Sequence, residues 1–340
     1  MTVDLGIPKL PPREEREPIV VSNSSIQTWK DCRRKYWLSY MRRLRPKQEK
    51  KSGPLALGSR VHSALETYYG ELLENPALTD RDRLMEIWAD LVKDDRLILE
   101  AEGQFTDDFD NEAELGRIML EGYYDWVEEE GIDSRYEIIG LEDTLEYPLH
   151  NGQVRVVGKL DQRVRDTVDG TLLVRDFKTS ANFADLMKTL EMNEQFLLYM
   201  TLEQLLKDEG DRVSGAIVTA LKKVKRTASA RPPFYTNERV DHNVFTLRNF
   251  YKHLLGVSSD ILNAWRDVED GADPHIVMYP HPTRDCSWKC PFAAGCSMFD
   301  NGGAAEQWLA DNFEVGSPFA YYGDSDPTKK TARPSKGGDA

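Results

Sequence analysis

Cysteine is scarce in this sequence, with four residues among 340, which excludes a disulfide-stapled scaffold. No run of about 18 uncharged apolar residues occurs, so the sequence predicts no membrane-spanning helix. The first residues lack the apolar core of a secretory signal, and we therefore expect a protein of a reducing compartment, the cytoplasm. A Gly-x4-Gly-Lys-Ser/Thr phosphate loop is also absent, so helicase activity in this chain is not expected.

Positive charge is in deficit, because 58 acidic residues face 44 basic ones and leave a net charge of −14. That total is unpromising for a protein that binds nucleic acid over its whole surface. Hydrophobic residues make up 40% of the chain and aromatic residues 10%, which is enough for a packed core and excludes a wholly disordered chain. The length suits two domains, or one α/β core with additions.

Composition and periodicity divide the chain into four segments. In order they are a Pro-rich extended arm (1–21), a helical region (22–131), a strand-containing core that ends in an irregular cysteine-bearing segment (132–300), and a C-terminal extension (301–340) with a disordered tail from about 323.

Helical spacing of apolar residues predicts helices over 22–40, 56–74, 80–101, 111–130, 185–208 and 243–268. A change of period predicts a hairpin over 136–165 with an Asn151-Gly152 turn, a third strand after Asp169-Gly170, and a buried strand over 213–221. Helices flanking a small central mixed β-sheet indicate an α/β fold.

Acidic residues gather on the second and third of these strands. Asp176 and Lys178 are two apart and share a face, while the direction of Asp161 depends on the turn. A two-residue turn places Asp161 opposite Lys178, and a four-residue turn places it opposite Asp176. Either way two carboxylates and an ammonium converge, which suits Mg²⁺ or Mn²⁺ and phosphodiester chemistry. A solvated strand face with ordinary salt bridges is the alternative.

Two helices carry polar pairs at i, i+4 spacing. His62 precedes Glu66 on the predicted helix over 56–74, and Gln195 precedes Tyr199 on the one over 185–208. Taken alone, such pairs are also found on packed or half-buried helices, so their meaning depends on the surrounding sequence.

The four cysteines form an uneven set, Cys32 alone and then Cys286, Cys290 and Cys296. Cys32 lies 254 positions before Cys286, a spacing that an iron–sulfur cluster tolerates. Four-cysteine zinc and free thiols remain open from spacing alone. Either metal would clip the first predicted helix to the C-terminal segment.

Together these motifs resemble the PD-(D/E)XK nucleases of the RecB-like branch. The resemblance is carried, over about residues 22–300, by Gly58-x3-His62-x3-Glu66, Gly158-x2-Asp161, Asp176-x-Lys178 and Gln195-x3-Tyr199 between Cys32 and the other cysteines. Within that branch, the motifs more specifically resemble the iron–sulfur members, namely the CRISPR-associated adaptation exonucleases and the AddB-type helicase–nuclease subunits.

The resemblance implies a restriction-endonuclease-like core and a metal-dependent DNA exonuclease acting on single strands or DNA ends, in recombination, repair or DNA processing. Asp161, Asp176 and Lys178 would be catalytic, and His62, Asp161, Asp176 and the Phe177 carbonyl would hold Mg²⁺ or Mn²⁺. Gln195 and Tyr199 would support the site and the DNA backbone, and the four cysteines would hold a structural [4Fe–4S] cluster. Glu142 is a further acidic candidate on the preceding strand that matches no motif.

Local basic runs offset the acidic total. Residues 30–51 hold ten basic residues against two acids, and residues 222–239 hold six against one. We expect Arg33, Arg34, Lys222 and Lys223 to contact DNA phosphates, although solvated surfaces look the same in sequence.

The partners expected are DNA and no membrane, with a helicase, recombinase or integrase partner and a homo-oligomer also compatible. The compartment would be the host cytoplasm if a phage encodes the protein. The alternative function is a catalytically inactive DNA-end-binding subunit of a helicase–nuclease or adaptation complex.

Overall fold

The computed structural model describes residues 16–48, 52–103 and 107–325. The chain forms two compact units, each built from separate stretches of sequence. The first unit comprises Met1–Glu49, Glu146–Gly158 and Asn249–Ala340, and the second comprises Lys50–Leu145 and Lys159–Arg248. Strands β3 (Tyr136–Leu149) and β4 (Val154–Asp166) contain residues of both units.

The second unit alternates helices with strands. Besides its parts of β3 and β4 and the first residues of α8, its elements are α3 (Pro54–Glu74), η3 (Pro76–Leu78), α4 (Arg81–Ala101), α5 (Asp107–Glu130), η4 (Asp133–Arg135), β5 (Leu172–Ser180), α6 (Phe183–Lys188), η5 (Leu190–Met192), α7 (Glu194–Leu206), β6 (Val213–Lys222) and β7 (Tyr235–Asp241).

The first unit contains shorter elements and one long helix. They are β1 (Ile19–Ser22), α1 (Asn23–Asp31), α2 (Arg33–Tyr36), η2 (Trp37–Met41), β2 (Leu44–Pro46), α8 (Val244–Glu269, from Asn249 onward), α9 (Pro274–Val277), α10 (Cys286–Lys289), η6 (Ala293–Gly295), α11 (Met298–Asn301), α12 (Ala305–Asn312), β8 (Phe313–Val315) and η7 (Ala320–Ser325).

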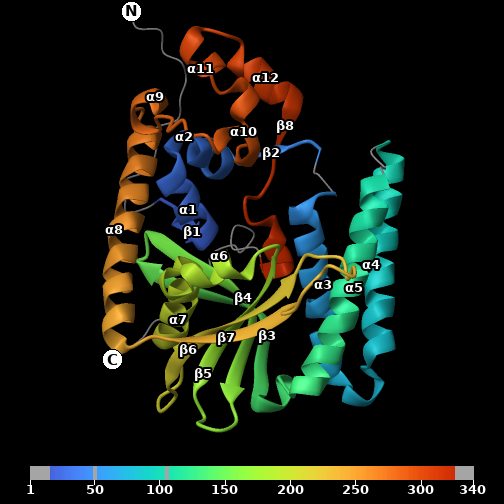
Figure 1. Cartoon of the computed structure of the whole chain (residues 1–340). Coiled ribbons are helices and arrows are strands. Elements are labelled where there is room, and N and C mark those ends of the chain that lie inside the picture. Colours follow the sequence, from blue (N-terminus) through green and yellow to red (C-terminus); the bar gives the residue numbers. More distant parts are fainter. Residues whose placement is uncertain (1–15, 49–51, 104–106, 326–340) are drawn as a thin grey trace, which may run out of the picture. The chain divides into compact units, whose positions relative to one another are not determined.

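A mixed sheet carries the strands of the predicted core (Figure 1). Its order is β1-β4-β5-β6-β7, with β3 paired to β4. The β4–β5 and β6–β7 pairs are antiparallel, whereas the β1–β4 and β5–β6 pairs are parallel. The predicted fold class, an α/β fold with a mixed sheet flanked by helices as in restriction-endonuclease-like cores, is confirmed.

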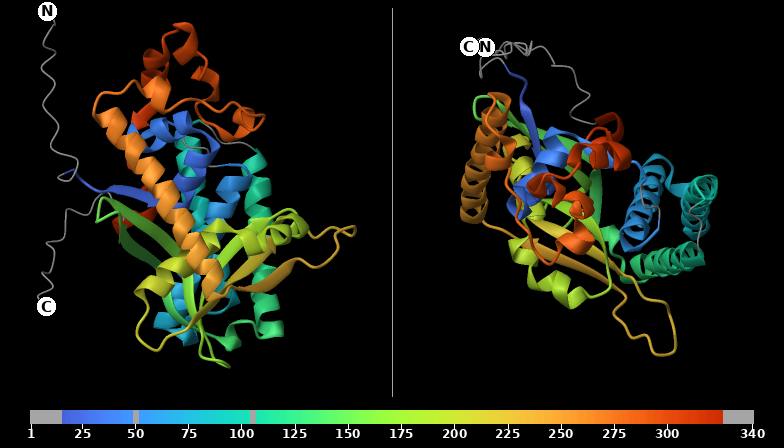
Figure 2. Two further views of the ribbon diagram at one scale, coloured as in Figure 1. Left: turned by 90° about the vertical axis from the view of Figure 1, so that its left-hand side faces the viewer. Right: turned by 90° about the horizontal axis from the view of Figure 1, so that it is seen from above.

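Helices cover both faces of the sheet within the second unit. Helices α3, α4 and α5 lie side by side (Figures 1 and 2), and their apolar residues form one cluster with Phe177 of β5 and Leu221 of β6. Asp176 points to the opposite face, because side chains alternate along a strand, and there its carboxylate contacts α7. Strand β5 is therefore packed on both of its faces.

Capping explains why the covering helices begin where they do. Helix α3 starts with Pro54 after Gly53, whose φ of 105° suits glycine alone among common residues. The side chain of Asp80 accepts a hydrogen bond from the backbone N–H of Arg83 and caps α4. Sequence periodicity predicts both helices to within two residues.

The helix predicted over 22–40 is interrupted, which corrects the sequence analysis. Cys32 has an extended backbone, with φ −164° and ψ 116°, and separates α1 from α2. The Cys32 Sγ accepts a hydrogen bond from the backbone N–H of His281 (3.4 Å). The apolar stripe continues across the break, so periodicity alone does not reveal it.

The helix predicted over 185–208 is also divided. Asn182 caps α6 and Asn193 caps α7, because each side chain accepts backbone hydrogen bonds from the following turn. Strand β7 was not predicted at all. Its sequence, YTNERVD, alternates weakly and has few apolar residues.

The ends of the chain lie partly outside the described residues. Of the expected extended arm, residues 1–15 lie outside them, and Ile19–Ser22 form strand β1. Of the tail expected to be disordered from about 323, the first residues complete η7 and residues 326–340 lie outside the description. Within the described ranges, no helix combines the length and apolarity that crossing a membrane requires.

Candidate active site

The turn between β4 and β5 has four residues, 167–170. Asp166 donates its backbone N–H to the Thr171 carbonyl (2.9 Å), which closes the turn. The Asp169 carboxylate accepts hydrogen bonds from the backbone N–H and the hydroxyl of Thr171. Gly170 adopts a positive φ of 70°, which a side chain would strain. These local bonds fix the length of the connection.

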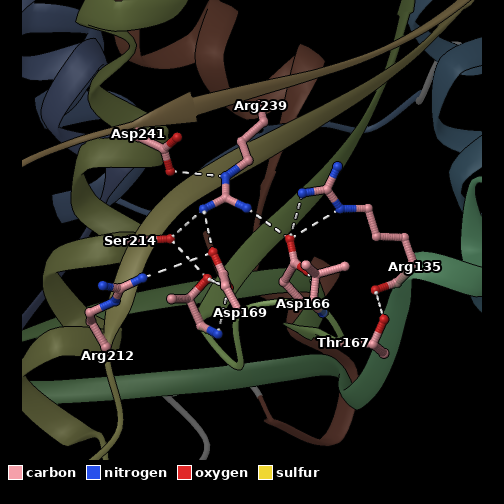
Figure 3. A network of polar contacts seen from close by, with 10 residues as sticks. Arg135, Asp166, Thr167, Asp169, Arg212, Ser214, Arg239 and Asp241 are labelled. Atoms are coloured by element: carbon pink, nitrogen blue, oxygen red, sulfur yellow. Dashed lines mark hydrogen bonds and ion pairs between the residues drawn. The ribbon is translucent and has the colours of Figure 1, made fainter.

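A network of ion pairs surrounds this turn (Figure 3). Asp166 is buried, and its Oδ2 accepts from Arg135 (2.9 Å) and from Arg239 of β7 (2.9 Å). Arg239 also donates to the Ser214 hydroxyl (2.9 Å) on β6. The network joins β4, β6 and β7 at the end of the sheet where the turn lies.

The turn determines which residues of β4 and β5 face each other. Gln162 lies opposite Arg175, so the next pair along the strands is Asp161 opposite Asp176. This is the second of the two alignments predicted from the sequence, and it brings the two carboxylates to one face.

Asp161 is held at the centre of the site by two contacts. The backbone N–H of Phe177 donates to its Oδ2 (2.8 Å), and the His62 Nδ1 lies 3.4 Å from the same oxygen. Burial and the neighbouring Asp176 carboxylate raise the pKa of Asp161 well above its usual range. The pair therefore stores electrostatic repulsion that a cation would relieve.

Lys178 supplies the positive charge beside these acids. Its Nζ lies 2.7 Å from the Asp176 Oδ2 and donates to the Gln195 Oε1 (3.0 Å). Burial disfavours the ammonium, but the carboxylates of Asp176 and Asp161 outweigh that effect and raise the pKa of Lys178. Lys178 is therefore a fixed cation at neutral pH.

Gln195 connects helix α7 to the strand residues. Its Nε2 lies within hydrogen-bond distance of the Asp176 Oδ1 (3.1 Å) and of the Tyr199 hydroxyl (2.9 Å). The Asn193 cap places Gln195 in the first turn of α7, next to β5. The structure thus brings together Asp161, Asp176, Lys178, Gln195 and Tyr199 as the sequence analysis expects.

His62 reaches the site because α3 packs closely on β5. A Cβ on Gly58 would lie only 2.9 Å from the Thr179 Oγ1, so glycine allows the close approach. Burial lowers the pKa of His62, which favours the neutral imidazole with a nitrogen lone pair available to a ligand. The close packing of α3 on β5 thus explains why a glycine stands four residues before His62.

Three more charged residues lie beside the carboxylate pair. Lys159 forms an ion pair with Glu142 (2.5 Å), and its Nζ lies 4.0 Å from the Glu66 carboxylate. Burial, opposed by the bond to Lys159, raises the pKa of Glu142 to about 7. Lys159 was missed by the sequence analysis, although it lies within the quoted Gly158-x2-Asp161 motif.

Arg175 forms a buried hub on the other face of the same strands. Only 1% exposed, it donates to Asp133 (2.7 Å), to the Thr219 hydroxyl (2.8 Å) and to the Tyr123 hydroxyl (3.4 Å). The Tyr69 hydroxyl of α3 bonds both Tyr123 and Asp133 (2.6 Å each). The hub links α3, α5 and β6 to β5, and no sequence motif indicates it.

The four cysteines of the first unit line one cavity of about 650 Å³. Each is reduced and partly buried. Burial raises the pKa of Cys290, and the nearby Lys35 opposes that effect. The structure therefore brings Cys32 to the same cavity as Cys286, Cys290 and Cys296.

The basic residues expected to contact DNA have different surroundings. Arg33 lies between the rings of Trp29 and Tyr279, 4.3 Å and 5.0 Å from their centroids. Arg34 is buried and makes a two-pronged ion pair with Asp300 (2.7 and 2.8 Å). A phosphate contact by Arg34 would require breaking that pair.

Lys222 and Lys223 belong to the second unit, at the end of β6. Both are partly buried, and the Lys223 ammonium donates to the Pro54 carbonyl (3.2 Å). These two therefore lie where strands β5 and β6 end, since Ser180 pairs with Lys222.

The donor set beside Lys178 fits a hard divalent cation. Two carboxylates, one neutral imidazole and a backbone carbonyl are donors that Mg²⁺ and Mn²⁺ accept, and the repulsion at Asp161 favours a cation. Across the described ranges, no group of three or more His, Cys, Asp or Glu residues could hold a metal ion as it stands.

Comparison with known proteins identifies the family. The model of the PD-(D/E)XK nuclease superfamily matches residues 20–297, most of the chain. The chain belongs to the PD-(D/E)XK nuclease superfamily. No curated protein sequence matches it.

Two solved structures are similar at low identity. One is a protein from Eubacterium rectale described as a candidate exonuclease, with a TM-score of 0.45, 11% identity, and coverage of 78% of this chain and 88% of that one. The other is SSO0001, with a TM-score of 0.28, 12% identity, and coverage of 80% and 94%. The family assignment depends on the superfamily match and not on these two likenesses.

Proposed function

We propose that this nuclease-superfamily protein is a metal-dependent deoxyribonuclease that removes nucleotides from single-stranded DNA or DNA ends. The observation that carries the proposal is the convergence of Asp161, Asp176 and Lys178 on one face of β4 and β5, with Gln195 bonded to both Asp176 and Lys178. Such an arrangement suits hydrolysis of a phosphodiester, whose transition state gains negative charge on oxygen.

Four groups would hold the metal ion: the Asp161 and Asp176 carboxylates, the His62 imidazole and the Phe177 carbonyl. A bound Mg²⁺ or Mn²⁺ supplies Lewis acidity and lowers the pKa of a coordinated water. Asp161 is already oriented by the Phe177 N–H, and His62 is kept neutral by burial.

Lys178 would orient the attacking water and stabilise the developing charge on the phosphoryl oxygen. Its ammonium is held by Asp176 and by Gln195, so it loses little freedom when substrate binds. Tyr199 in turn fixes the Gln195 amide. In the reaction a water oxygen bonds to phosphorus, the bond to one ester oxygen breaks, and that oxygen takes up a proton.

A structural [4Fe–4S] cluster is proposed for the cysteine-lined cavity. Support comes from the four cysteines around one cavity and from the cations Lys30, Lys35 and Lys289 among its lining residues, which would offset the charge of thiolates. The cluster would fix α1 and α2 against the segment around α10. Arg33 and Arg34 would then present a basic ridge, with the Arg34 contact depending on release of Asp300.

Cleavage of end-labelled DNA by anaerobically purified protein tests the function. Single- and double-stranded DNA are incubated with Mn²⁺, Mg²⁺ or EDTA, using the wild type, Asp176→Ala, and Asp185→Ala as a matched control on the exposed surface of α6. We expect metal-dependent shortening from one end by the wild type and the control, and none by Asp176→Ala.

Two outcomes would count against the proposal. Full cleavage by Asp176→Ala would mean that this site does not catalyse DNA cleavage. DNA binding without cleavage in either metal would favour the DNA-end-binding subunit instead. Absorbance of the anaerobic protein, with iron and sulfide analysis of wild type and Cys290→Ser, separately tests the cluster against zinc, which is colourless.

A further inference from the structure

Strand β6 leads into a loop that is rich in positive charge. We call residues 222–234 the basic arm; it contains Lys222, Lys223, Lys225, Arg226 and Arg231 and no acidic residue. Both views of Figure 2 show this segment, coloured gold, projecting from the sheet. Its next acidic neighbour along the chain is Glu238, inside β7.

The cations of the basic arm have neutral partners. Lys225 donates to the Asn111 side chain (2.9 Å), Arg226 to the Val224 carbonyl (2.6 Å), and Arg231 to the Ala228 carbonyl (2.7 Å). In the described part of the second unit, none of the arm's cations forms an ion pair with a carboxylate.

Elsewhere in the same unit the usual partner is an acid. Arg81 pairs with Glu121, Arg83 with Glu71, and Arg117 with Glu114. Neutral partners orient a cation without cancelling its charge. Glu114 attracts Lys225 without forming an ion pair, so the positive charge of the basic arm is less compensated than that of the paired arginines.

Contacts within the basic arm also fix its conformation in the absence of a ligand. The Arg226 guanidinium stacks on the Phe234 ring at 3.8 Å and donates to the Tyr235 hydroxyl (2.8 Å). Backbone bonds from Thr227 to the Lys225 carbonyl and from Ala230 to the Thr227 carbonyl turn the chain (2.9 Å each). A preformed cationic loop loses less entropy on binding than a disordered one.

The base of the arm lies beside the candidate active site. Ser180 pairs with Lys222, and the Lys223 N–H donates to the Ser180 carbonyl (2.8 Å). Lys178 precedes Ser180 by two residues, roughly 7 Å along the strand. A polyanion held by the arm would thus extend past the carboxylate pair.

We propose that the basic arm binds the phosphate backbone of the substrate strand away from the scissile phosphate, through Lys225 and Arg231. The inference rests on the proposed function and deepens it. It assigns DNA binding to the basic arm and phosphodiester cleavage to the pair Asp161 and Asp176. Phosphates are the partner that fits, since the arm presents five positive charges and no acidic residue.

Binding of DNA in EDTA, where cleavage is absent, tests the arm directly. The probe is a short fluorescein-labelled single strand, and separately its duplex, titrated with full-length protein over a series of salt concentrations. The variants are Lys225→Ala/Arg231→Ala and Ser229→Asp, which adds an acid to the exposed arm. Lys93→Ala/Lys188→Ala, which removes two exposed cations of the same unit, is the matched control.

We expect the double arm variant to reduce the salt slope, log Kd against log salt, by about 1.4 for the single strand or about 1.8 for the duplex, with affinity at least about tenfold weaker. Ser229→Asp should weaken binding in the same direction. Turnover at saturating DNA in Mn²⁺ should remain at the wild-type rate while KM rises. The control should behave as the wild type.

Unchanged affinity and salt slope in both arm variants would overturn the inference, as would an equal loss in the control. A loss of turnover at saturating DNA would also overturn it, because the arm would then take part in chemistry. If the wild type neither binds nor cleaves DNA, the proposed function fails instead, and the two failures are therefore distinguishable.

Discussion

The two faces of the β4–β5 pair differ in how their charges are satisfied. On one face the side chains of Asp161 and Lys178 are partly open to solvent, with exposures of 19% and 28%, while Asp176 between them is buried at 2%. On the other face Arg175 is enclosed and has a protein partner on each of its nitrogens. Adjacent residues of the same strands thus belong to opposite electrostatic environments.

One face of the β4–β5 pair therefore contributes mainly to stability, and the other face carries the candidate active site. The Arg175 hub fixes β5 against β6, α5 and the helix that carries His62, so it positions the residues opposite. On the carboxylate face, burial and then the Asp176 carboxylate raise the pKa of Asp161, so part of that shift comes from repulsion between the two acids. If the carboxylate face binds a cation as proposed, the metal-free site is less stable than it could be, and the enclosed face offsets that loss.

Removing the hub should give the largest effect on the fold. Arg175→Met leaves Asp133 without its buried partner, and we expect the free energy of unfolding to fall by about 3–5 kcal/mol. Urea denaturation measures the loss. Arg165→Met removes the partly exposed ion pair between Arg165 of the neighbouring strand β4 and Asp211; this control should cost under about 1 kcal/mol. Equal losses would mean that the two faces do not differ.

Removing the cation from the open face should act on rate instead. Lys178→Ala takes away the group that we propose stabilises the developing negative charge, and we expect kcat to fall by about 10²–10³-fold. Single-turnover cleavage of labelled DNA measures it, with Lys188→Ala as control. If Lys178→Ala cleaves DNA at the wild-type rate, Lys178 does not stabilise the developing negative charge.

Neutralising one carboxylate should stabilise the metal-free protein while abolishing cleavage. Asp161→Asn removes the repulsion from Asp176 and keeps the shape, so we expect the free energy of unfolding in EDTA to rise by about 1–2 kcal/mol. Asp143→Asn, which removes a more exposed acid paired with Arg163, should not stabilise. A destabilised Asp161→Asn protein would show that the open face is not strained.

The smallest effect concerns acid stability at the β4–β5 turn. Burial opposes ionisation of Asp166, but hydrogen bonds from Arg135 and the Val168 N–H outweigh it and lower the pKa of Asp166. The unfolded chain therefore binds the proton more tightly than the fold does. The stabilisation is complete above about pH 4, the unfolded value, and is lost as pH falls through the lower folded pKa.

Asp166→Asn should accordingly cost about 1 kcal/mol at neutral pH and progressively less below about pH 4. Thermal unfolding from neutral to acid pH compares the variant with the wild type. A constant difference across that range would mean that the ionised carboxylate contributes nothing.

Sequence periodicity predicts most helices and four of the strands because their buried faces are apolar. It limits the β4–β5 alignment to two possibilities but cannot choose between them, since the choice depends on the bond between Asp166 and Thr171. Strand β7 escapes prediction because its inward residues are polar, as with Asn237, which bonds Thr219 on β6. Its stability comes from partners elsewhere in the chain.

The candidate site is predictable where spacing carries information. Residues two apart on a strand, or four apart on a helix, must share a face, which gives Asp176 with Lys178 and Gln195 with Tyr199. Arg175 has no such signal, because its partners Asp133, Tyr69 and Thr219 are distant in sequence and a charged strand residue is usually exposed. Local sequence patterns cannot predict that a charged residue is buried by partners distant in the sequence.

The cysteine-lined cavity has a consequence for the order in which the protein is made. Cys32 leaves the ribosome first, and Cys286, Cys290 and Cys296 follow more than 250 residues later. At translation rates of about 5–20 residues per second, the first thiol waits roughly 13–50 s for the others. During that interval the whole nuclease core emerges. The cavity therefore closes only after the segment that carries the last three cysteines has been synthesised.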